Sequence, residues 1–143
     1  MRKLVAIVGV LALLAGMTYL FLFKNDNDHF FDQGVEYYEQ KKNNEALFYF
    51  EKSEELGNAE ALKYSATIYL ETNNPQKAIS KFEKYISKIG LNNKDSKFVL
   101  NDLGVAYFKL NDTENAKKYW KMAAELGNTT SANNLKELET KMK

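Results

Sequence analysis

The sequence predicts an all-α protein, with an N-terminal single transmembrane helix followed by an α-solenoid of three helix pairs and a C-terminal capping helix. Three observations favour this fold class. An early apolar run is long and uncharged, the remainder carries apolar residues at helical spacing, and small and aromatic residues recur there at a fixed interval. No segment alternates apolar and polar residues as a half-buried strand does.

The stretch from Leu4 to Phe23 contains no charged residue and is about 20 residues long, which as a helix matches the hydrocarbon core of a bilayer. Arg2 and Lys3 precede it, so the positive-inside rule predicts that residues 1–3 are a cytoplasmic stub. We expect residues 24–28 to be a linker. The helix would then lie in a bacterial inner membrane, with the C-terminal domain in the periplasm.

A cleaved signal peptide is the alternative interpretation of this segment, and it would release the protein into the periplasm. The small residues Ala12, Ala15 and Gly16 lie in the middle of the run, and cleavage there would leave an exposed apolar stub. We therefore favour an uncleaved anchor. Ala12 and Gly16 also form a small-xxx-small pair, which can hold two transmembrane helices in a weak homodimer, although small residues are ordinary in such helices.

The composition excludes several functional classes. The 143 residues carry 20 basic and 19 acidic side chains, and the net charge of +1 argues against a strongly basic nucleic-acid-binding protein. The absence of cysteine excludes disulfides, thiol catalysis and iron–sulfur clusters. Arg2 is the only arginine, so the rest of the chain lacks a planar fork for bidentate binding of phosphate or carboxylate.

Residues 24–143 consist of consecutive amphipathic segments separated by turn signals. Three segments end at a glycine, a residue that often caps a helix C-terminus: Gly57, Gly90 and Gly127. Asn74 followed by Pro75 is typical of a helix N-terminus, and Asn111 with Glu114 resembles a capping box. These signals predict helices over residues 29–41, 45–56, 59–72, 75–88, 95–109, 113–126 and 130–142.

Three sets of small and aromatic residues share one spacing. They are Gly34, Tyr37, Ala46, Phe50 and Ser53; Ala66, Tyr69, Ala78, Phe82 and Tyr85; and Gly104, Tyr107, Ala116, Trp120 and Ala123. In each set an alanine follows the first small residue by 12 positions, and an aromatic residue follows that alanine by 4. Two short helices that cross closely need small residues at the crossing, and stacked helix pairs bury what one pair cannot. The expected facing pairs are Gly34–Ala46, Ala66–Ala78 and Gly104–Ala116.

This pattern, small–x2–Tyr followed by Ala–x3–aromatic, resembles the tetratricopeptide repeat family over about residues 27–127. The strings at residues 55–61 and 123–128 resemble the related Sel-like repeats. The resemblance implies a repeat domain over residues 29–143. Its units would be about residues 27–58, 59–94 and 95–127, with a cap over residues 128–143.

In that family the first helices of the units line a concave groove that holds an extended or helical segment of a partner protein, and the resemblance implies the same use here. The residues expected along this groove are Phe31, Asp32, Val35, Tyr38, Lys63, Tyr64, Thr67, Leu70, Phe98, Asn101, Asp102, Val105 and Phe108. This surface is aromatic and apolar with few charges, as many binding hot spots are. Alternatively, some of these side chains, Phe31 and Phe98 above all, pack on neighbouring helices.

Some members of the family bind the C-terminal carboxylates of a chaperone through a clamp of lysine, asparagine and arginine. The matching positions in this chain are Phe31, Val35, Tyr64, Phe98 and Asp102. The clamp is therefore missing, and we do not expect that class of partner.

We expect no catalytic, metal or cofactor site. His29 is the only histidine, and Asp28 and Asp32 lie near it, but acidic residues at a helix start are usual because they complement the helix dipole. No serine has a histidine in a plausible motif, and the glycines after residue 24 are isolated rather than grouped in a phosphate-binding loop. The chain is thus predicted not to be an enzyme and not to bind nucleic acid.

The predicted function is that of a membrane-anchored adaptor or scaffold, which binds a protein partner in the groove and raises its concentration at the membrane. Two alternatives stay open. The chain could be a structural subunit of an envelope complex, or an immunity-type neutraliser of a toxic enzyme, as some Sel-like repeat proteins are.

Overall fold

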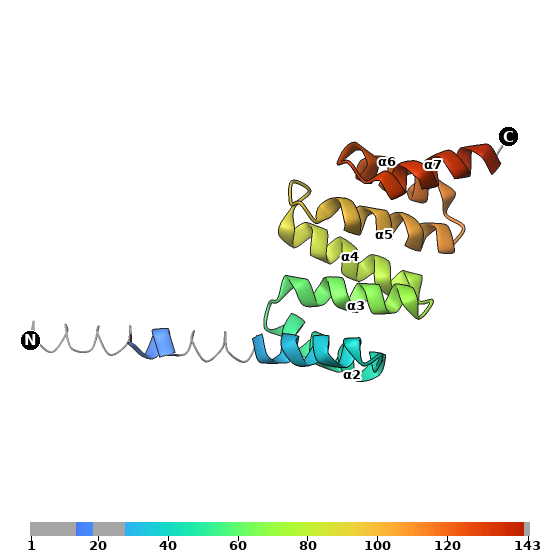
Figure 1. Cartoon of the computed structure of the whole chain (residues 1–143). Coiled ribbons are helices and arrows are strands. Elements are labelled where there is room, and N and C mark those ends of the chain that lie inside the picture. Colours follow the sequence, from blue (N-terminus) through green and yellow to red (C-terminus); the bar gives the residue numbers. More distant parts are fainter. Residues whose placement is uncertain (1–13, 19–27, 142–143) are drawn as a thin grey trace, which may run out of the picture. The chain divides into compact units, whose positions relative to one another are not determined.

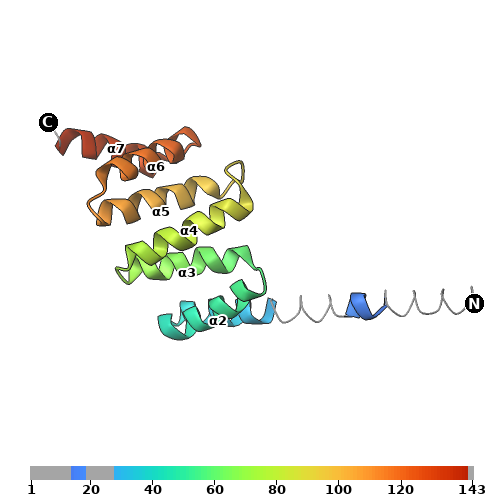
Figure 2. The same ribbon diagram turned by 180° about the vertical axis from the view of Figure 1, so that it is seen from behind.

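The computed structural model describes residues 14–18 and 28–141, which form helices joined by short turns. The chain divides into two units, between residues 58 and 59. Figures 1 and 2 show the helices of both units from opposite sides. The helices predicted after residue 28 are confirmed, and their bounds differ from the prediction by at most two residues.

In the first unit, a helix over residues 28–39 pairs with α2 (Asn43–Glu55). Gly34 lies at a close contact within this pair, because a Cβ atom there would be 2.6 Å from the ring of Phe50. Phe50 is completely buried. The rings of Tyr37 and Tyr49 stack across the same pair, with centroids 5.2 Å apart. The glycine therefore makes room for an aromatic ring of the facing helix.

In the second unit, consecutive helices pack on one another in chain order (Figure 1). They are α3 (Ala59–Glu71), α4 (Pro75–Ile89), α5 (Ser96–Lys109), α6 (Thr113–Glu125) and α7 (Thr129–Lys141). Leu62, Phe82, Leu100 and Leu103 are among the fully buried side chains between them. Burying each of these side chains contributes about 1.5–3 kcal/mol by removing it from water, and the stacked helices bury more of them than a single helix pair could.

The third helix pair, α5 with α6, repeats the close approach of the first pair. A Cβ atom at Gly104 would overlap the indole ring of Trp120, a side chain that is only 4% exposed. The atoms nearest to Gly34 and Gly104 thus belong to aromatic rings and not to Ala46 or Ala116, the partners expected from the spacing. Positions four residues apart share a helix face, and the longer aromatic side chain fills the space left by the glycine.

Left-handed backbone conformations mark the turns of every repeat. Lys41, Asn73 and Asn111 have φ of 61°, 59° and 60° at the turn inside each helix pair. The three glycines predicted to cap helices are confirmed in this role at Gly57, Gly90 and Gly127, with φ of 93°, 76° and 84°. A side chain at those glycines would be strained, so the turn geometry explains the residue type.

The capping box predicted at Asn111 and Glu114 is replaced by a different cap. Asp112 is the N-cap of α6, and its carboxylate accepts a hydrogen bond from the backbone N–H of Asn115 at 3.1 Å. Asn111 instead occupies the left-handed turn position, which asparagine tolerates better than most residues. Pro75 is at the start of α4 as predicted.

The predicted fold class is wrong in its N-terminal element. No helix in the described part of the chain is both long enough and apolar enough to cross a membrane. Within the expected span, residues 4–23, the structure describes residues 14–18, which are helical. The prediction rested on the uncharged run and on the charges that flank it, and residues 4–13 and 19–23 lie outside the described residues.

The predicted homodimer contact is not supported either. Of the two residues expected at this contact, Gly16 is described and exposed, and Ala12 lies outside the described residues. The choice between an anchor and a cleaved signal peptide falls on the same undescribed residues.

Candidate functional site

One face of α5 is left uncovered by its neighbours in the second unit. Phe98 and Phe108 are 55% and 44% exposed, and Asn101, Asp102 and Val105 between them are half-buried. Residues three or four apart lie on one side of a helix, so these five form a single stripe along α5. The opposite side of α5 is buried in the core, which fixes the stripe facing outward.

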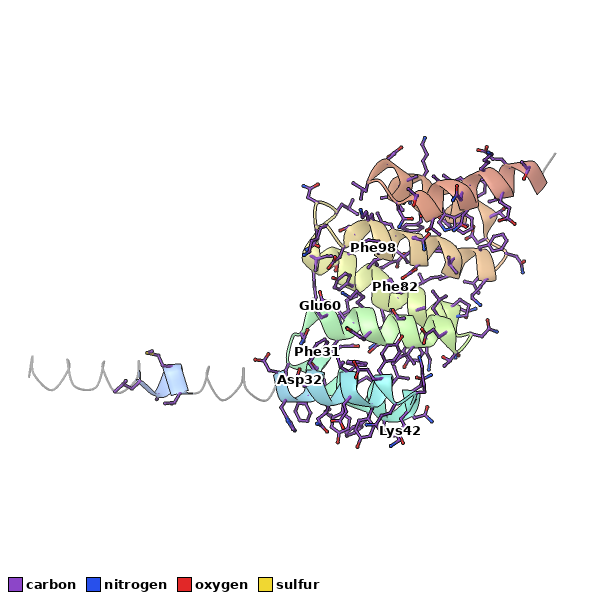
Figure 3. The ribbon with its side chains drawn as sticks, in the orientation of Figure 1. Phe31, Asp32, Lys42, Glu60, Phe82 and Phe98 are labelled. Carbon is purple, nitrogen blue, oxygen red and sulfur yellow. The ribbon has the colours of Figure 1, made fainter. Side chains whose placement is uncertain are left out.

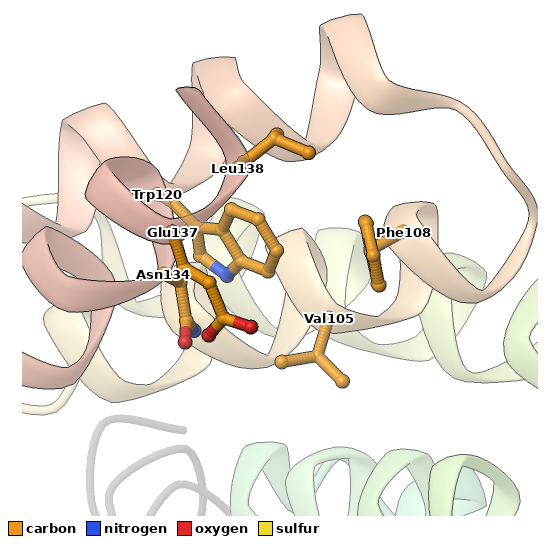
Figure 4. A pocket seen from close by; sticks show the side chains of 6 residues that line it. All are labelled: Val105, Phe108, Trp120, Asn134, Glu137 and Leu138. Carbon is orange, nitrogen blue, oxygen red and sulfur yellow. The ribbon is translucent and has the colours of Figure 1, made fainter. Parts of the chain in front are cut away.

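A small apolar hollow adjoins the C-terminal part of this stripe. It has a volume of about 200 Å³ and is lined by Val105 and Phe108 of α5, Trp120 of α6, and Asn134, Glu137 and Leu138 of α7. Figure 4 shows the Trp120 indole at its centre with Leu138, Phe108 and Val105 around it. The ring of Trp120 lies 5.6 Å from that of Phe108, and its Nε1 donates to the backbone oxygen of Asn101 at 3.2 Å. The hollow is therefore a preformed site for an apolar side chain.

A polar hollow of about 390 Å³ adjoins the N-terminal part of the stripe. Its lining residues are Lys97, Phe98, Asn101, Asp102, Gly127, Asn128, Thr129 and Thr130. We call the apolar and polar hollows together the α5–α7 groove, because both are bordered by these two helices. Figure 3 labels Phe98, which marks the N-terminal end of the groove.

Hydrogen bonds join α7 to α5 beneath the polar hollow. The Ser131 hydroxyl donates to Asn101 Oδ1 at 2.8 Å, and Asn128 Nδ2 donates to the backbone oxygen of Lys97 at 3.0 Å. Asn128 Oδ1 accepts from the backbone N–H of Ser131 at 2.9 Å. Ser131 and Asn128 are themselves buried, so their bonds hold the two walls of the groove at a fixed separation.

Asp102 is the only acidic residue lining the polar hollow. Burial raises the pKa of its carboxyl group, and the hydrogen bond from Asn101 Nδ2, 3.2 Å from Asp102 Oδ1, opposes this shift. Among the described residues no lysine lies within salt-bridge distance of it. Lys97, the other charged group of the hollow, lies over the Phe98 ring at 5.1 Å from its centroid. The groove thus contains a partly desolvated carboxylate without a cationic partner.

On α3, the expected groove residues occupy different environments. Lys63 forms an ion pair with Glu60 and lies near the rings of Tyr64 and Tyr85. The Thr67 hydroxyl donates to the backbone oxygen of Lys63 at 3.0 Å. Tyr64 is half-buried. Leu70 packs against the hydrophobic core of the second unit.

On the helix over residues 28–39, Phe31, Val35 and Tyr38 are half-buried and Asp32 is exposed. Figure 3 labels Phe31 and Asp32 on this helix. Phe31 contacts the ring of Phe50, with centroids 5.9 Å apart. Because these residues belong to the first unit, their place in the binding surface stays a prediction.

Sequence reasoning missed one wall of the groove. It treated α7 as a capping helix, yet Asn134, Glu137 and Leu138 line the apolar hollow. Their spacing of three and four residues, which places them on one helix face, could have indicated a shared role. Within the described ranges, the structure contains no cluster of three metal-ligating side chains.

Residues 99–128, which form most of α5 and α6, match the family model described as tetratricopeptide repeat. No curated protein matches the chain. Among solved structures, the N-terminal domain of stress-induced protein-1 from C. elegans is 21% identical, with a TM-score of 0.74 over 82% of this chain and 97% of that one.

Two further similar structures are complexes. The first tetratricopeptide repeat domain of Spaghetti (RPAP3), bound to the HSP90 peptide SRMEEVD, is 22% identical with a TM-score of 0.72, over 82% of this chain and 94% of that one. The TPR2AB domain of yeast Sti1 in complex with pHSP90 is 19% identical with a TM-score of 0.69, over 81% of this chain and 47% of that one. Similarity at these identities shows the fold, which is that of tetratricopeptide repeat domains. The Sel-like part of the resemblance stays a prediction.

Proposed function

We propose that this tetratricopeptide-type fold serves as a protein–protein interaction module, which binds a peptide segment or helix of a partner in the α5–α7 groove. The observation that carries the proposal is the uncovered stripe on α5. Two large aromatic side chains, Phe98 and Phe108, are about half exposed at its ends, and preformed hollows lie beside it. Exposed aromatic anchors next to a polar rim are typical of binding hot spots.

The structures of similar fold support a peptide ligand, because the RPAP3 domain among them is bound to the HSP90 peptide SRMEEVD. An acidic chaperone tail is not the ligand that we propose for this chain. The peptide in the RPAP3 complex carries more acidic than basic residues. Here the groove contains Asp102, while Lys63 is paired with Glu60 and no arginine follows Arg2. A partner of different charge suits these residues better.

Chemical crosslinking of the full chain in its own cells, followed by mass spectrometry of captured proteins, tests the proposal. The test variant replaces Phe98 and Phe108 by alanine, and the control replaces Phe48 and Leu91, which are 55% and 44% exposed but line no part of the groove. We expect one dominant partner that the groove variant loses and the control variant keeps. Equal capture by both variants would place binding elsewhere and refute the proposal.

No observation favours a structural subunit or an immunity-type neutraliser over this function. The periplasmic location stays a prediction from the sequence.

A further inference from the structure

The charges along the α5–α7 groove restrict which segment it can hold. The charged residues that line its two hollows are Lys97, Asp102 and Glu137, so the lining carries one net negative charge. The positive charge of Lys97 lies over the Phe98 ring, at the outer end of the polar hollow. Asp102 is one helical turn further along α5, beside Val105 of the apolar hollow.

Keeping the Asp102 carboxyl group ionised at this half-buried position costs free energy. A carboxylate that is partly removed from water loses solvation, and one hydrogen bond from Asn101 replaces only part of it. A cationic side chain from a partner would supply the missing counter-charge inside the polar hollow, where water screens less than at an open surface. An acidic side chain at the same place would be repelled.

The apolar hollow is close enough to be filled by the same segment. Asp102 and Val105 are three residues apart on α5, which is a rise of about 4.5 Å. On an extended peptide, side chains two residues apart lie about 6–7 Å from one another on the same side, and on a helix those three or four apart lie about 5–6 Å apart. One short segment can therefore place a cation at Asp102 and an apolar group against Trp120.

We infer that the α5–α7 groove selects a partner segment in which a lysine or arginine lies two to four residues from a bulky apolar residue. The cation binds Asp102 in the polar hollow, and the apolar side chain enters the hollow formed by Val105, Phe108, Trp120 and Leu138. This inference rests on the proposed function, because it specifies the ligand of the same groove. Its charge preference is opposite to that of a groove built for acidic tails.

Selection from a phage-displayed library of short random peptides, with the full chain as target, tests the inference. Phe98→Ala/Phe108→Ala and Asp102→Asn variants are parallel targets. We expect wild-type selections to be enriched in lysine or arginine two to four residues from phenylalanine, leucine, isoleucine, methionine or tryptophan. On Asp102→Asn the enrichment in basic residues should disappear while the apolar preference remains.

The affinity of one selected peptide for purified variants gives the quantitative test. Asp102→Asn keeps the acceptor for Asn101 and removes the charge, so we expect affinity to fall about tenfold or more. Lys97→Gln removes a like charge near the peptide cation, so affinity should stay the same or rise about two- to threefold.

The outcomes separate the two proposals. If the wild-type chain selects no peptides beyond those taken by the Phe98→Ala/Phe108→Ala variant, the peptide-binding function itself fails. If it does select groove-dependent peptides, but these are neutral or acidic, or bind Asp102→Asn equally well, the function stands and the inferred charge preference is overturned.

Discussion

In the helix pair of the first unit the rings of Tyr37 and Tyr49 stack with centroids 5.2 Å apart, and in the α5–α6 pair those of Tyr107 and Tyr119 stack at 5.3 Å. The interplanar angle is 9° in both pairs. In each pair a glycine also lies against a large buried ring of the facing helix. The same residue spacing thus produces the same local geometry in two separate parts of the chain.

The two tyrosine pairs differ in what lies next to them. The hydroxyls of Tyr107 and Tyr119 both donate to Glu83 Oε1 of α4, at 3.1 and 3.2 Å. In the part of the chain that the structure describes, no carboxylate accepts from Tyr37 or Tyr49. The repeat pattern therefore determines how two helices pair, whereas the connection to the preceding pair depends on a residue outside that pattern.

The largest loss of stability is expected when either of the buried rings that lie against the two glycines is removed. Trp120→Ala and Phe50→Ala should each lower the free energy of unfolding by about 3–5 kcal/mol, because each leaves a cavity between paired helices. Urea unfolding of the full chain, followed by far-UV circular dichroism, measures this. The control Phe48→Ala, at an exposed position, should change it by no more than about 0.5 kcal/mol. A similarly small loss for Trp120→Ala would contradict the packing described.

Gly104→Ala tests the close approach itself. Alanine favours a helix over glycine by about 1 kcal/mol, yet here its Cβ would overlap the Trp120 ring. We expect a net loss of about 1–3 kcal/mol in the same urea experiment, from displacement of the indole. Ala66→Gly, at the matching position of the middle pair, should lower stability by about 1 kcal/mol through helix propensity. A more stable Gly104→Ala protein would show that the glycine is not required there.

Glu83→Gln addresses the difference between the tyrosine pairs. Burial first, and then the charge of Glu83, raises the pKa of Tyr119 to about 12, from 10.0. Because the folded chain holds this proton more tightly than the unfolded chain, stability should fall as the pH rises from about 10 to about 12. Losing the charged acceptor should lower the free energy of unfolding at neutral pH by about 1 kcal/mol and lower the pKa of Tyr119.

Unfolding at several alkaline pH values, with tyrosinate absorbance, measures both effects of Glu83→Gln. Glu51 follows Phe50 as Glu83 follows Phe82, so Glu51→Gln is the matched control, and we expect it to change neither quantity. An equal effect of the two variants would remove the distinction between the pairs.

The smallest effect on stability is expected for Asp102→Asn, and unlike the preceding variants this one should be stabilising. Burial raises the pKa of this carboxyl group, so the folded chain binds its proton more readily than the unfolded chain does. Stability from this group is greatest below its unfolded pKa of about 3.9 and decreases as the pH rises through the folded pKa. Asp102→Asn should therefore be slightly more stable than wild type at neutral pH and equal to it in acid. A less stable Asp102→Asn protein at neutral pH would mean that the carboxylate supports the fold.

The helices and their pairing could be predicted because their signals are local. A glycine such as Gly57 or Gly127 ends a helix through its own backbone freedom, and the 12-residue interval brings two helix faces together within one hairpin. The partner of Gly104 could not be predicted in the same way. The small residue and the ring that fills its space lie on different helices, and only packing decides that Trp120 rather than Ala116 reaches it.

In the candidate site too, features set by helical periodicity could be predicted and features set by packing between helices could not. The stripe from Phe98 to Phe108 follows from helical periodicity, and the sequence identified its members. Leu70 has the same periodicity on α3, but there the structure packs it against the core. The wall supplied by α7 was missed because its register against α5 depends on hydrogen bonds between Ser131, Asn128 and residues about 30 positions earlier.

By itself, the sequence determined that this chain forms short amphipathic helices, where they begin and end, and that they pair in a tetratricopeptide-like pattern. Backbone preference and side-chain periodicity act over a few residues, so they can be read without a structure. Only the tertiary structure decided which aromatic ring fills each glycine gap and that Glu83 accepts hydrogen bonds from two tyrosines. It also decided that Asp102 lies in a groove where no lysine of the described residues pairs with it. These features join residues far apart in the chain, and burial, which sets their energies, exists only after the helices have packed.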